Sequence, residues 1–105
     1  MSADLRQLQK EVYQNKIDKG FNTTDVAMEF CRAHEELSEA FKKYNAKEDG
    51  VPEEMADVAI FLLGMAEMLN FDLEKEIVRK VAINKKRKYE KINGAWIRVA
   101  TTEDP

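Results

Sequence analysis

The sequence has few of the residues on which several common kinds of site depend. Its 105 residues include one cysteine, Cys31, and one histidine, His34. These counts exclude an internal disulfide and a zinc site of the usual Cys/His type. The four glycines stand apart from one another, which excludes the glycine-rich loops that hold phosphates in P-loop and dinucleotide-binding proteins. With a single histidine, nucleophilic catalysis by a Ser/His/Asp or Cys/His arrangement is not expected either.

The chain also has no large excess of charge of one sign and no long apolar run. The 17 basic and 20 acidic residues give a formal net charge of -3, so the chain as a whole offers no electrostatic footprint for nucleic acid or an anionic membrane. The longest apolar run, residues 58–65, is much shorter than a membrane span, and the polar N-terminus lacks the apolar core of a signal peptide. We therefore expect no nucleic-acid partner, no membrane association and a cytoplasmic location.

The spacing of charged and apolar residues predicts an all-α fold. Proline and glycine are rare, and apolar residues recur at intervals of three and four, which is typical of helices joined by short connections. The expected helices span residues 3–19, 23–44, 52–70 and 73–91. Four residues mark their ends: Gly20 stops the first, Asn22 and Asp72 cap the second and fourth, and Pro52 suits the first turn of the third. Residues 1–94 thus form a single domain, and residues 95–105 follow an Asn93-Gly94 turn as a short C-terminal tail.

The third expected helix is apolar almost all the way round. Between Met55 and Leu69 its only charged residues are Asp57 and Glu67. A helix of this kind belongs in the middle of a bundle or in a subunit interface. Because four helices of this length cannot cover every face of one member, we expect the chain to form a homodimer or a homotetramer.

Acidic residues cluster at helical spacing on the second and third helices. Glu36 and Glu39 are three residues apart, and Glu35 lies one turn from Glu39, so their carboxylates can approach one another. Glu54 and Asp57 repeat the three-residue spacing. Asp57 directly precedes an apolar run, where a carboxylate loses solvation unless a cation or several donors compensate. Two such pairs on adjacent helices suit a hard cation, and Mg²⁺ is the natural choice where phosphates complete its octahedron.

Other interpretations of these acids remain open. A glutamate-rich helix face is usually only solvated, and for the three glutamates of the second helix alone that interpretation is favoured. Glu53 could replace Glu54 as the partner of Asp57, at a four-residue spacing. A ferritin-like di-iron site would need two histidines on Glu-x-x-His helices, so His34 is expected to be structural or solvent-facing rather than a ligand.

The fourth expected helix carries a stripe that changes character along its length. At about 100° per residue the stripe contains Leu73, Ile77, Lys80, Asn84 and Arg87. Its first half is apolar, whereas its second half is cationic and hydrogen-bonding, which suits the binding of phosphates. Arg87 can grip a phosphate with two hydrogen bonds, Lys80 provides a point charge, and Asn84 can donate or accept. The neighbouring lysines at positions 85, 86 and 88 are interpreted as a solvated helix end.

Three motifs in this order resemble a known enzyme family. EELSE at residues 35–39, EMAD at 54–57 and K-VAI-N-KK-R at 80–87 are similar to the signature of the MazG-like all-α nucleoside triphosphate pyrophosphohydrolases. That signature is E-E-x-x-E, a spacer, E-x-x-D and often a later Lys/Asn/Arg group, and the match covers about residues 22–91. In this family the paired acids bind magnesium, and a water attacks the α-phosphorus of a nucleoside triphosphate to give the monophosphate and pyrophosphate.

The resemblance implies a fold and a set of site residues. The fold would be a four-helix MazG-like bundle assembled through a homodimer or a dimer of dimers, with active sites near the subunit contacts. Mg²⁺ would be the cofactor, with Mn²⁺ as a substitute. The implied metal ligands are Glu36, Glu39, Glu54 and Asp57, the implied substrate contacts are Lys80, Asn84 and Arg87, and Glu35 would be either a ligand of a further metal or the residue that orients the water.

The substrate and the role stay open at this level. Removal of noncanonical or surplus deoxynucleotides is favoured, but the family also has members that act on phosphoribosyl-ATP and on deoxyuridine nucleotides. The base could stack on Tyr13, Phe21, Tyr89 or Trp96, although an aromatic residue at helical spacing more often belongs to a core. The alternative from a different class is a non-catalytic helical module whose apolar third helix docks a partner and which is indifferent to magnesium.

Overall fold

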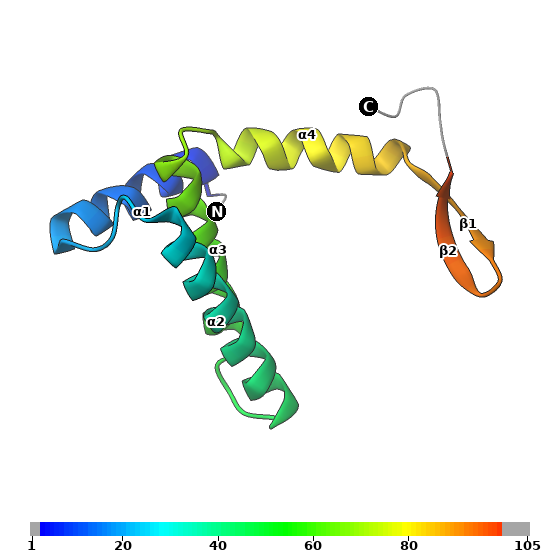
Figure 1. The fold of residues 1–105 in the computed structure, drawn as a ribbon, viewed down its shortest axis with the longest axis horizontal. Coiled ribbons are helices and arrows are strands. Elements are labelled where there is room, and N and C mark those ends of the chain that lie inside the picture. Colours follow the sequence, from blue (N-terminus) through cyan, green and yellow to red (C-terminus); the bar gives the residue numbers. More distant parts are fainter. Residues whose placement is uncertain (1–2, 100–105) are drawn as a thin grey trace. The chain divides into compact units, whose positions relative to one another are not determined.

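The computed structural model describes residues 3–99 and consists of two compact units that divide after Leu73. The first unit contains the helices α1 (Leu5–Lys19), α2 (Val26–Asn45) and α3 (Val51–Met68) (Figure 1). The second contains nearly all of α4 (Leu73–Lys86), followed by the strands β1 (Lys88–Ile92) and β2 (Ala95–Val99). The prediction of a mostly helical chain with four helices is thereby confirmed, and a small two-stranded sheet is added to it.

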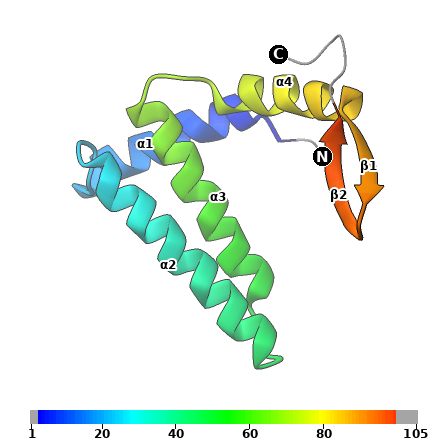
Figure 2. The ribbon, with the colours of Figure 1, turned by 45° about the vertical axis from the view of Figure 1, so that its right-hand side comes forward.

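Helices α2 and α3 form the framework of the first unit. They run antiparallel and pack against each other, as Figure 2 shows, and α1 packs against α3. The buried apolar residues are contributed by α2 and α3 and are mostly small: Ala33, Ala40, Leu63, Met65 and Ala66. Gly64 in α3 faces α1, since a Cβ atom there would be in ordinary van der Waals contact with Val12 at 3.5 Å and with Lys16 at 3.6 Å.

The end of α1 follows the sequence signal, whereas the start of α2 does not. Gly20 adopts a left-handed conformation with φ +68° and ends α1 as predicted. Asn22 was expected to cap α2, and this prediction is wrong, because the capping residue is Asp25, whose side chain accepts a hydrogen bond from the Met28 N–H at 3.1 Å. Asn22 instead accepts from the Asp25 N–H at 2.9 Å and so shapes the turn before the helix.

The fourth helix is shorter than expected, because the chain turns into a hairpin. It ends at Lys86 rather than near residue 91, and β1 pairs antiparallel with β2 from Lys88 opposite Val99 to Ile92 opposite Ala95. The turn residues Asn93 and Gly94 have φ +51° and +82°, which is the conformation that Asn-Gly favours between hairpin strands. The all-α prediction is therefore incomplete, and residues 95–99 of the expected tail form β2. The remainder of that tail, residues 100–105, lies outside the described residues.

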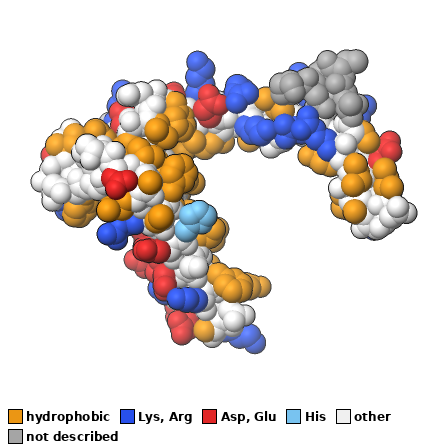
Figure 3. All heavy atoms as spheres, viewed as in Figure 1, with side chains coloured by type: hydrophobic (Ala, Val, Ile, Leu, Met, Phe, Trp, Pro, Cys, Tyr) orange, Lys and Arg blue, Asp and Glu red, His pale blue; other side chains and the backbone are white. Residues whose placement is uncertain are grey.

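Much apolar surface remains exposed on the first unit. Met55, Ile60 and Leu62 in α3, and Leu69 directly after it, are between 45% and 58% exposed. Figure 3 shows acidic side chains along one edge of the α2–α3 pair and hydrophobic side chains on the opposite edge. One apolar hollow of about 410 Å³ lies between the end of α2 and the start of α3. Despite its apolar character, α3 is not a membrane span, since no helix in residues 3–99 has the length and hydropathy to cross a bilayer.

A buried glutamine fixes α1 to the end of α3. Gln9 is fully buried, and its amide nitrogen donates to the Glu67 carboxylate at 2.8 Å and to the Phe71 carbonyl at 2.7 Å. Its amide oxygen accepts from the Leu73 N–H at 3.1 Å. Arg6 adds an ion pair to Glu67 at 2.9 Å. Through one side chain, α1 thus satisfies polar groups that α3 and the following turn leave unpaired.

Replacing this glutamine should cost much of the stability of the first unit. The variant Gln9→Leu keeps a side chain of similar size but leaves the Phe71 carbonyl and the Leu73 N–H without partners, so we expect a loss of about 2–4 kcal/mol in the free energy of unfolding. Urea denaturation followed by circular dichroism measures this change. The matched control is Gln14→Leu, which removes an exposed hydrogen bond to Asp18 on the same helix, and its effect should stay within about 0.5 kcal/mol. Equal effects of the two substitutions would contradict the role of Gln9.

Candidate metal centre

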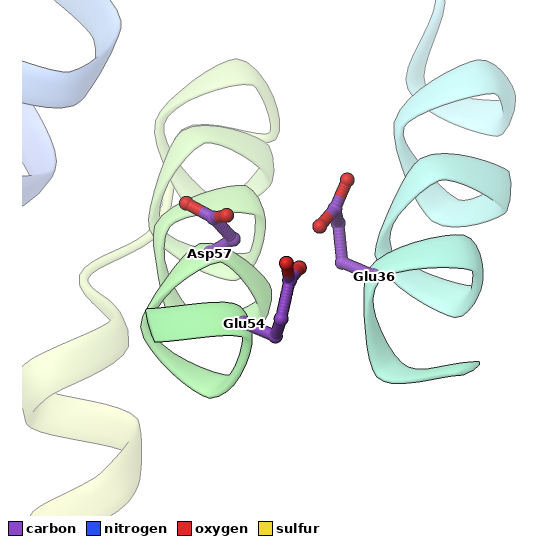
Figure 4. A group of neighbouring side chains, drawn as sticks. All are labelled: Glu36, Glu54 and Asp57. Atoms are coloured by element: carbon purple, nitrogen blue, oxygen red, sulfur yellow. The ribbon is translucent and has the colours of Figure 1, made fainter. Parts of the chain in front are cut away.

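Three acidic side chains from two helices converge in the first unit. Glu36 projects from α2, and Glu54 and Asp57 project from α3. All three are partly buried, and one carboxylate oxygen of each lies within 4.8 Å of those of the other two. Figure 4 shows the carboxylates directed toward one another in the space between α2 and α3. The three-residue spacing puts Glu54 and Asp57 on one face of α3, and the antiparallel pairing brings Glu36 opposite them.

The pKa values of Glu36 and Glu54 are shifted in opposite directions. A hydrogen bond with Glu54 raises the pKa of Glu36, and partial burial and the nearby charges of Glu54, Asp57 and Glu39 raise it further. The pKa of Glu54 is lowered, first by its hydrogen bond with Lys43 and then by the one with Glu36. Of these two carboxyl groups, Glu36 is therefore the one that takes up a proton first as the pH falls.

Lys43 is part of this group, although the sequence motifs did not single it out. Its ammonium lies 2.8 Å from a carboxylate oxygen of Glu54, and this hydrogen bond raises the pKa of Lys43. The available signal was its position seven residues after Glu36, two turns further along the same face of α2. Lys43 supplies positive charge next to the converging acids and so offsets part of their repulsion.

The other predicted acids lie outside this group. Glu39 is half exposed on α2 and pairs with Lys42 at 3.3 Å, and Glu35 is exposed. Their roles as a metal ligand and as a catalytic residue stay predictions. On α3 it is Glu54, rather than the exposed Glu53, that accompanies Asp57. His34 is exposed and belongs to no metal-binding group among the described residues.

The predicted phosphate contacts belong to the second unit. Lys80 and Asn84 are exposed on α4, and Arg87 directly follows the end of that helix. Arg87 stays close to Asn84, because its guanidinium donates to the side-chain oxygen of Asn84 at 3.1 Å. The Nε atom of Arg87 is buried and has no hydrogen-bond partner within residues 3–99. These residues can form a small donor group, and their contact with a substrate stays a prediction.

The donor set of the acid group fits a hard cation. It offers only carboxylate oxygens, which are the ligands that Mg²⁺, Mn²⁺ and Ca²⁺ prefer. Neighbouring ligands of an octahedral magnesium ion lie about 3–4 Å apart, so small side-chain rotations would bring these oxygens around one ion.

Comparisons of the chain with known proteins found no matching family model, no matching curated protein and no matching solved structure.

Removing the Glu36 carboxylate should stabilise the metal-free protein while abolishing its response to metal. An acid with a raised pKa stabilises the folded state only while protonated, so this contribution is present at low pH and lost as the pH rises through the raised pKa. Glu36→Gln mimics the protonated form, and we expect it to raise the melting temperature at pH 7 in the presence of a chelator. Below the ordinary value of 4.5 the difference from the wild type should disappear. Scanning calorimetry measures both.

The control for this variant is Glu35→Gln, which removes the same charge from an exposed neighbouring position. It should leave the melting temperature nearly unchanged. Added Mg²⁺ should stabilise the wild type but not Glu36→Gln, because the variant lacks one ligand. A wild-type melting temperature at or above that of Glu36→Gln under chelation would refute the raised pKa of Glu36.

Proposed function

We propose that the chain is a magnesium-dependent nucleoside triphosphate pyrophosphohydrolase, which converts a (deoxy)nucleoside triphosphate to the monophosphate and pyrophosphate. The observation that carries the proposal is the convergence of Glu36, Glu54 and Asp57. These are three of the four metal ligands implied by the MazG-like resemblance, and they come from the two helices that carry its first two motifs. The proposed role is the removal of noncanonical or surplus deoxynucleotides.

The acids would hold the cation in a position where it can also coordinate a triphosphate. A bound Mg²⁺ would neutralise the phosphate oxygens and lower the pKa of a coordinated water, which supplies a nucleophile near neutral pH. A cation would bind the ionised form of Glu36, whose pKa is raised, so cation binding should weaken as the pH falls. Lys43 keeps Glu54 ionised and therefore ready to act as a ligand. Glu35 is proposed to orient the attacking water or to bind a further ion.

Lys80, Asn84 and Arg87 are proposed to receive the phosphates that are not attacked. The α4 helix and the residue after it present an ammonium, an amide and a guanidinium at helical spacing. The buried Nε of Arg87 has a hydrogen-bonding capacity that a phosphate oxygen could satisfy. Positive charge there would hold these phosphates equally in the ground state and in the transition state.

We also propose that the protein assembles as a homodimer or a dimer of dimers in a MazG-like helical bundle. Phe30, Leu37, Phe41, Tyr44 and Met55, all on α2 or α3, are at least 45% exposed. An exposed apolar surface of this kind is typical of a protein-protein interface. The same surface would serve a non-catalytic docking module, and the two functions differ in their dependence on magnesium.

The first test is pyrophosphate release from a panel of nucleoside triphosphates and phosphoribosyl-ATP, with Mg²⁺ or with chelator. We expect magnesium-dependent release from at least one compound and none under chelation. Asp57→Asn keeps the shape of the side chain but weakens a ligand, so kcat should fall at least about 100-fold with an unchanged circular dichroism spectrum. The control Glu53→Gln alters an exposed acid of the same helix and should retain activity. Full activity of Asp57→Asn would remove this residue from the site, and no turnover of any compound would favour the docking module.

A second test concerns the cationic residues. Arg87→Ala removes a guanidinium proposed to bind phosphate in the ground state and the transition state alike, so KM should rise about tenfold while kcat changes little. Steady-state kinetics on the best substrate of the panel measures both constants. Lys85→Ala removes an exposed positive charge from the same helix end and should leave KM nearly unchanged. An unchanged KM for Arg87→Ala, or an equal increase for both variants, would refute the assignment of Arg87.

A further inference from the structure

Positive charge is concentrated in the second unit, although the net charge of the whole chain is -3. Residues 74–105 contain nine basic and five acidic residues, whereas residues 1–73 contain eight basic and fifteen acidic ones. Figure 3 shows lysine and arginine side chains along α4. The overall charge, from which we expected no nucleic-acid partner, therefore averages an acidic first unit and a basic second unit.

The hairpin of the second unit has two unlike faces. In an antiparallel pair, residues directly opposite each other lie on the same face, and successive residues of a strand lie on opposite faces. The register thus puts one aromatic and one basic residue of each strand on a shared face, which we call the aromatic–basic face: Tyr89 and Lys91 of β1, and Trp96 and Arg98 of β2. The opposite face carries the aliphatic residues of the hairpin together with Lys88 and Glu90.

The aromatic–basic face is exposed and contains no acidic residue. Trp96 is 69% exposed and Tyr89 is 50% exposed. An antiparallel sheet commonly packs its apolar face and leaves the other face to solvent, so packing of the hairpin would use the aliphatic face. Burial in a core therefore does not account for the two rings on the opposite face, whereas exposed rings beside cations are typical of surfaces that bind nucleic acid.

The arrangement of this face suits a single strand rather than a duplex. Tyr89 and Trp96 are diagonal neighbours across the hairpin, which places them about 7–8 Å apart. Bases stacked in a duplex are about 3.4 Å apart and present only their edges, so rings at this separation suit the separated bases of an extended strand. Each ring has a basic residue directly opposite it on the other strand, where it can pair with a phosphate. An anionic membrane is a poorer partner, because the aliphatic residues that would enter a bilayer lie on the opposite face.

We propose that the aromatic–basic face binds single-stranded nucleic acid, with bases stacked on Trp96 and Tyr89 and phosphates paired with Lys91 and Arg98. Binding of this kind tolerates any sequence, because every base has a face on which a ring can stack. The basic residues in the last turn of α4 precede the hairpin directly and add to the attraction for a polyanion. The proposal is independent of the proposed pyrophosphohydrolase function, which concerns a mononucleotide and the acid group.

The test uses the fluorescence of Trp96, which is the only tryptophan of the chain. The ligands are oligothymidine and oligouridine of about ten nucleotides without terminal phosphates, which is long enough to reach both rings. They are titrated in the presence of a chelator, so that no divalent cation can bring a phosphate to the acid group. Stacking on Trp96 should quench its fluorescence with either oligonucleotide or both. The mononucleotide dTTP should bind at least about tenfold more weakly, because it cannot stack on both rings.

Two variants separate the two kinds of contact, with the affinity measured by fluorescence anisotropy of a labelled oligonucleotide. Trp96→Val keeps a strand-forming residue but removes the ring, so the affinity should fall at least about tenfold. Lys91→Gln/Arg98→Gln keeps both rings. It should make the plot of log affinity against log salt shallower by about 1.4, since each phosphate contact with a single strand contributes about 0.7.

The matched control is Lys75→Gln/Arg79→Gln, which removes two exposed positive charges from α4. It should change the affinity by less than about twofold and leave the salt dependence nearly as it is. Cross-strand pairs also stabilise hairpins. If amide chemical shifts show that Trp96→Val loses the hairpin, Lys91→Gln/Arg98→Gln decides the test, because it retains both rings.

Four results would overturn the proposal. The first is that neither oligonucleotide quenches Trp96. The second is equal affinity for dTTP and the oligonucleotides, which would assign the face to a mononucleotide. The third is a fluorescence change with vesicles of anionic phospholipid but not with oligonucleotides, which would assign the face to a membrane. The fourth is an equal loss of affinity in Lys91→Gln/Arg98→Gln and in the control, which would show that only the overall positive charge of the unit attracts the strand.

Discussion

The antiparallel pairing of α2 and α3 brings together carboxylates that repel one another, and neighbouring groups reduce this repulsion. It brings Glu36 against Glu54 and Asp57, and three carboxylates at this separation repel one another. The hydrogen bond with Glu54 and this repulsion raise the pKa of Glu36, and the ammonium of Lys43 offsets part of the repulsion through its contact with Glu54. A cation held by this group would compensate the same repulsion.

The sequence predicted the features that depend on a single helix. The repeat of three and four residues gave α1, α2 and α3, Gly20 marked the end of α1, and the spacing of Glu54 and Asp57 placed both on one face. It failed where two local signals compete. Asn22 and Asp25 both have capping side chains within one turn, and only the backbone conformation decides which of them caps α2. At the C-terminal end, the helix was expected to continue to residue 91, although the Asn-Gly turn after it is flanked by strand-forming residues and is a strong hairpin signal.

The partners across helices were harder to predict, because they depend on register and on the choice of rotamer. The spacing of Glu36 and Glu39 permits both to face α3, yet Glu39 has Lys42 three residues away on its own helix and pairs with it. Lys43 joins the acid group only because the α2–α3 register puts it next to Glu54. The ion pair of Lys16 with Glu29 also joins two helices, and periodicity alone cannot indicate it, since both residues belong to charged types that are usually exposed.

The same cross-helix polar contacts explain why the space between α1 and α3 stays open. Gln9 fixes α1 near one end through Glu67 and the turn after α3, and Lys16 fixes it near the other end through Glu29 on α2. Hydrogen bonds and ion pairs require defined distances, so α1 cannot slide or tilt freely to close the gap as it could with apolar contacts alone. Leu8 and Val12, which lie along α1 within this polar frame, therefore line a cavity rather than fill a core. Hydrogen bonds and ion pairs at both ends of α1 thus keep the mostly apolar cavity open without a ligand. A cavity that is already formed loses less conformational entropy when a ligand binds.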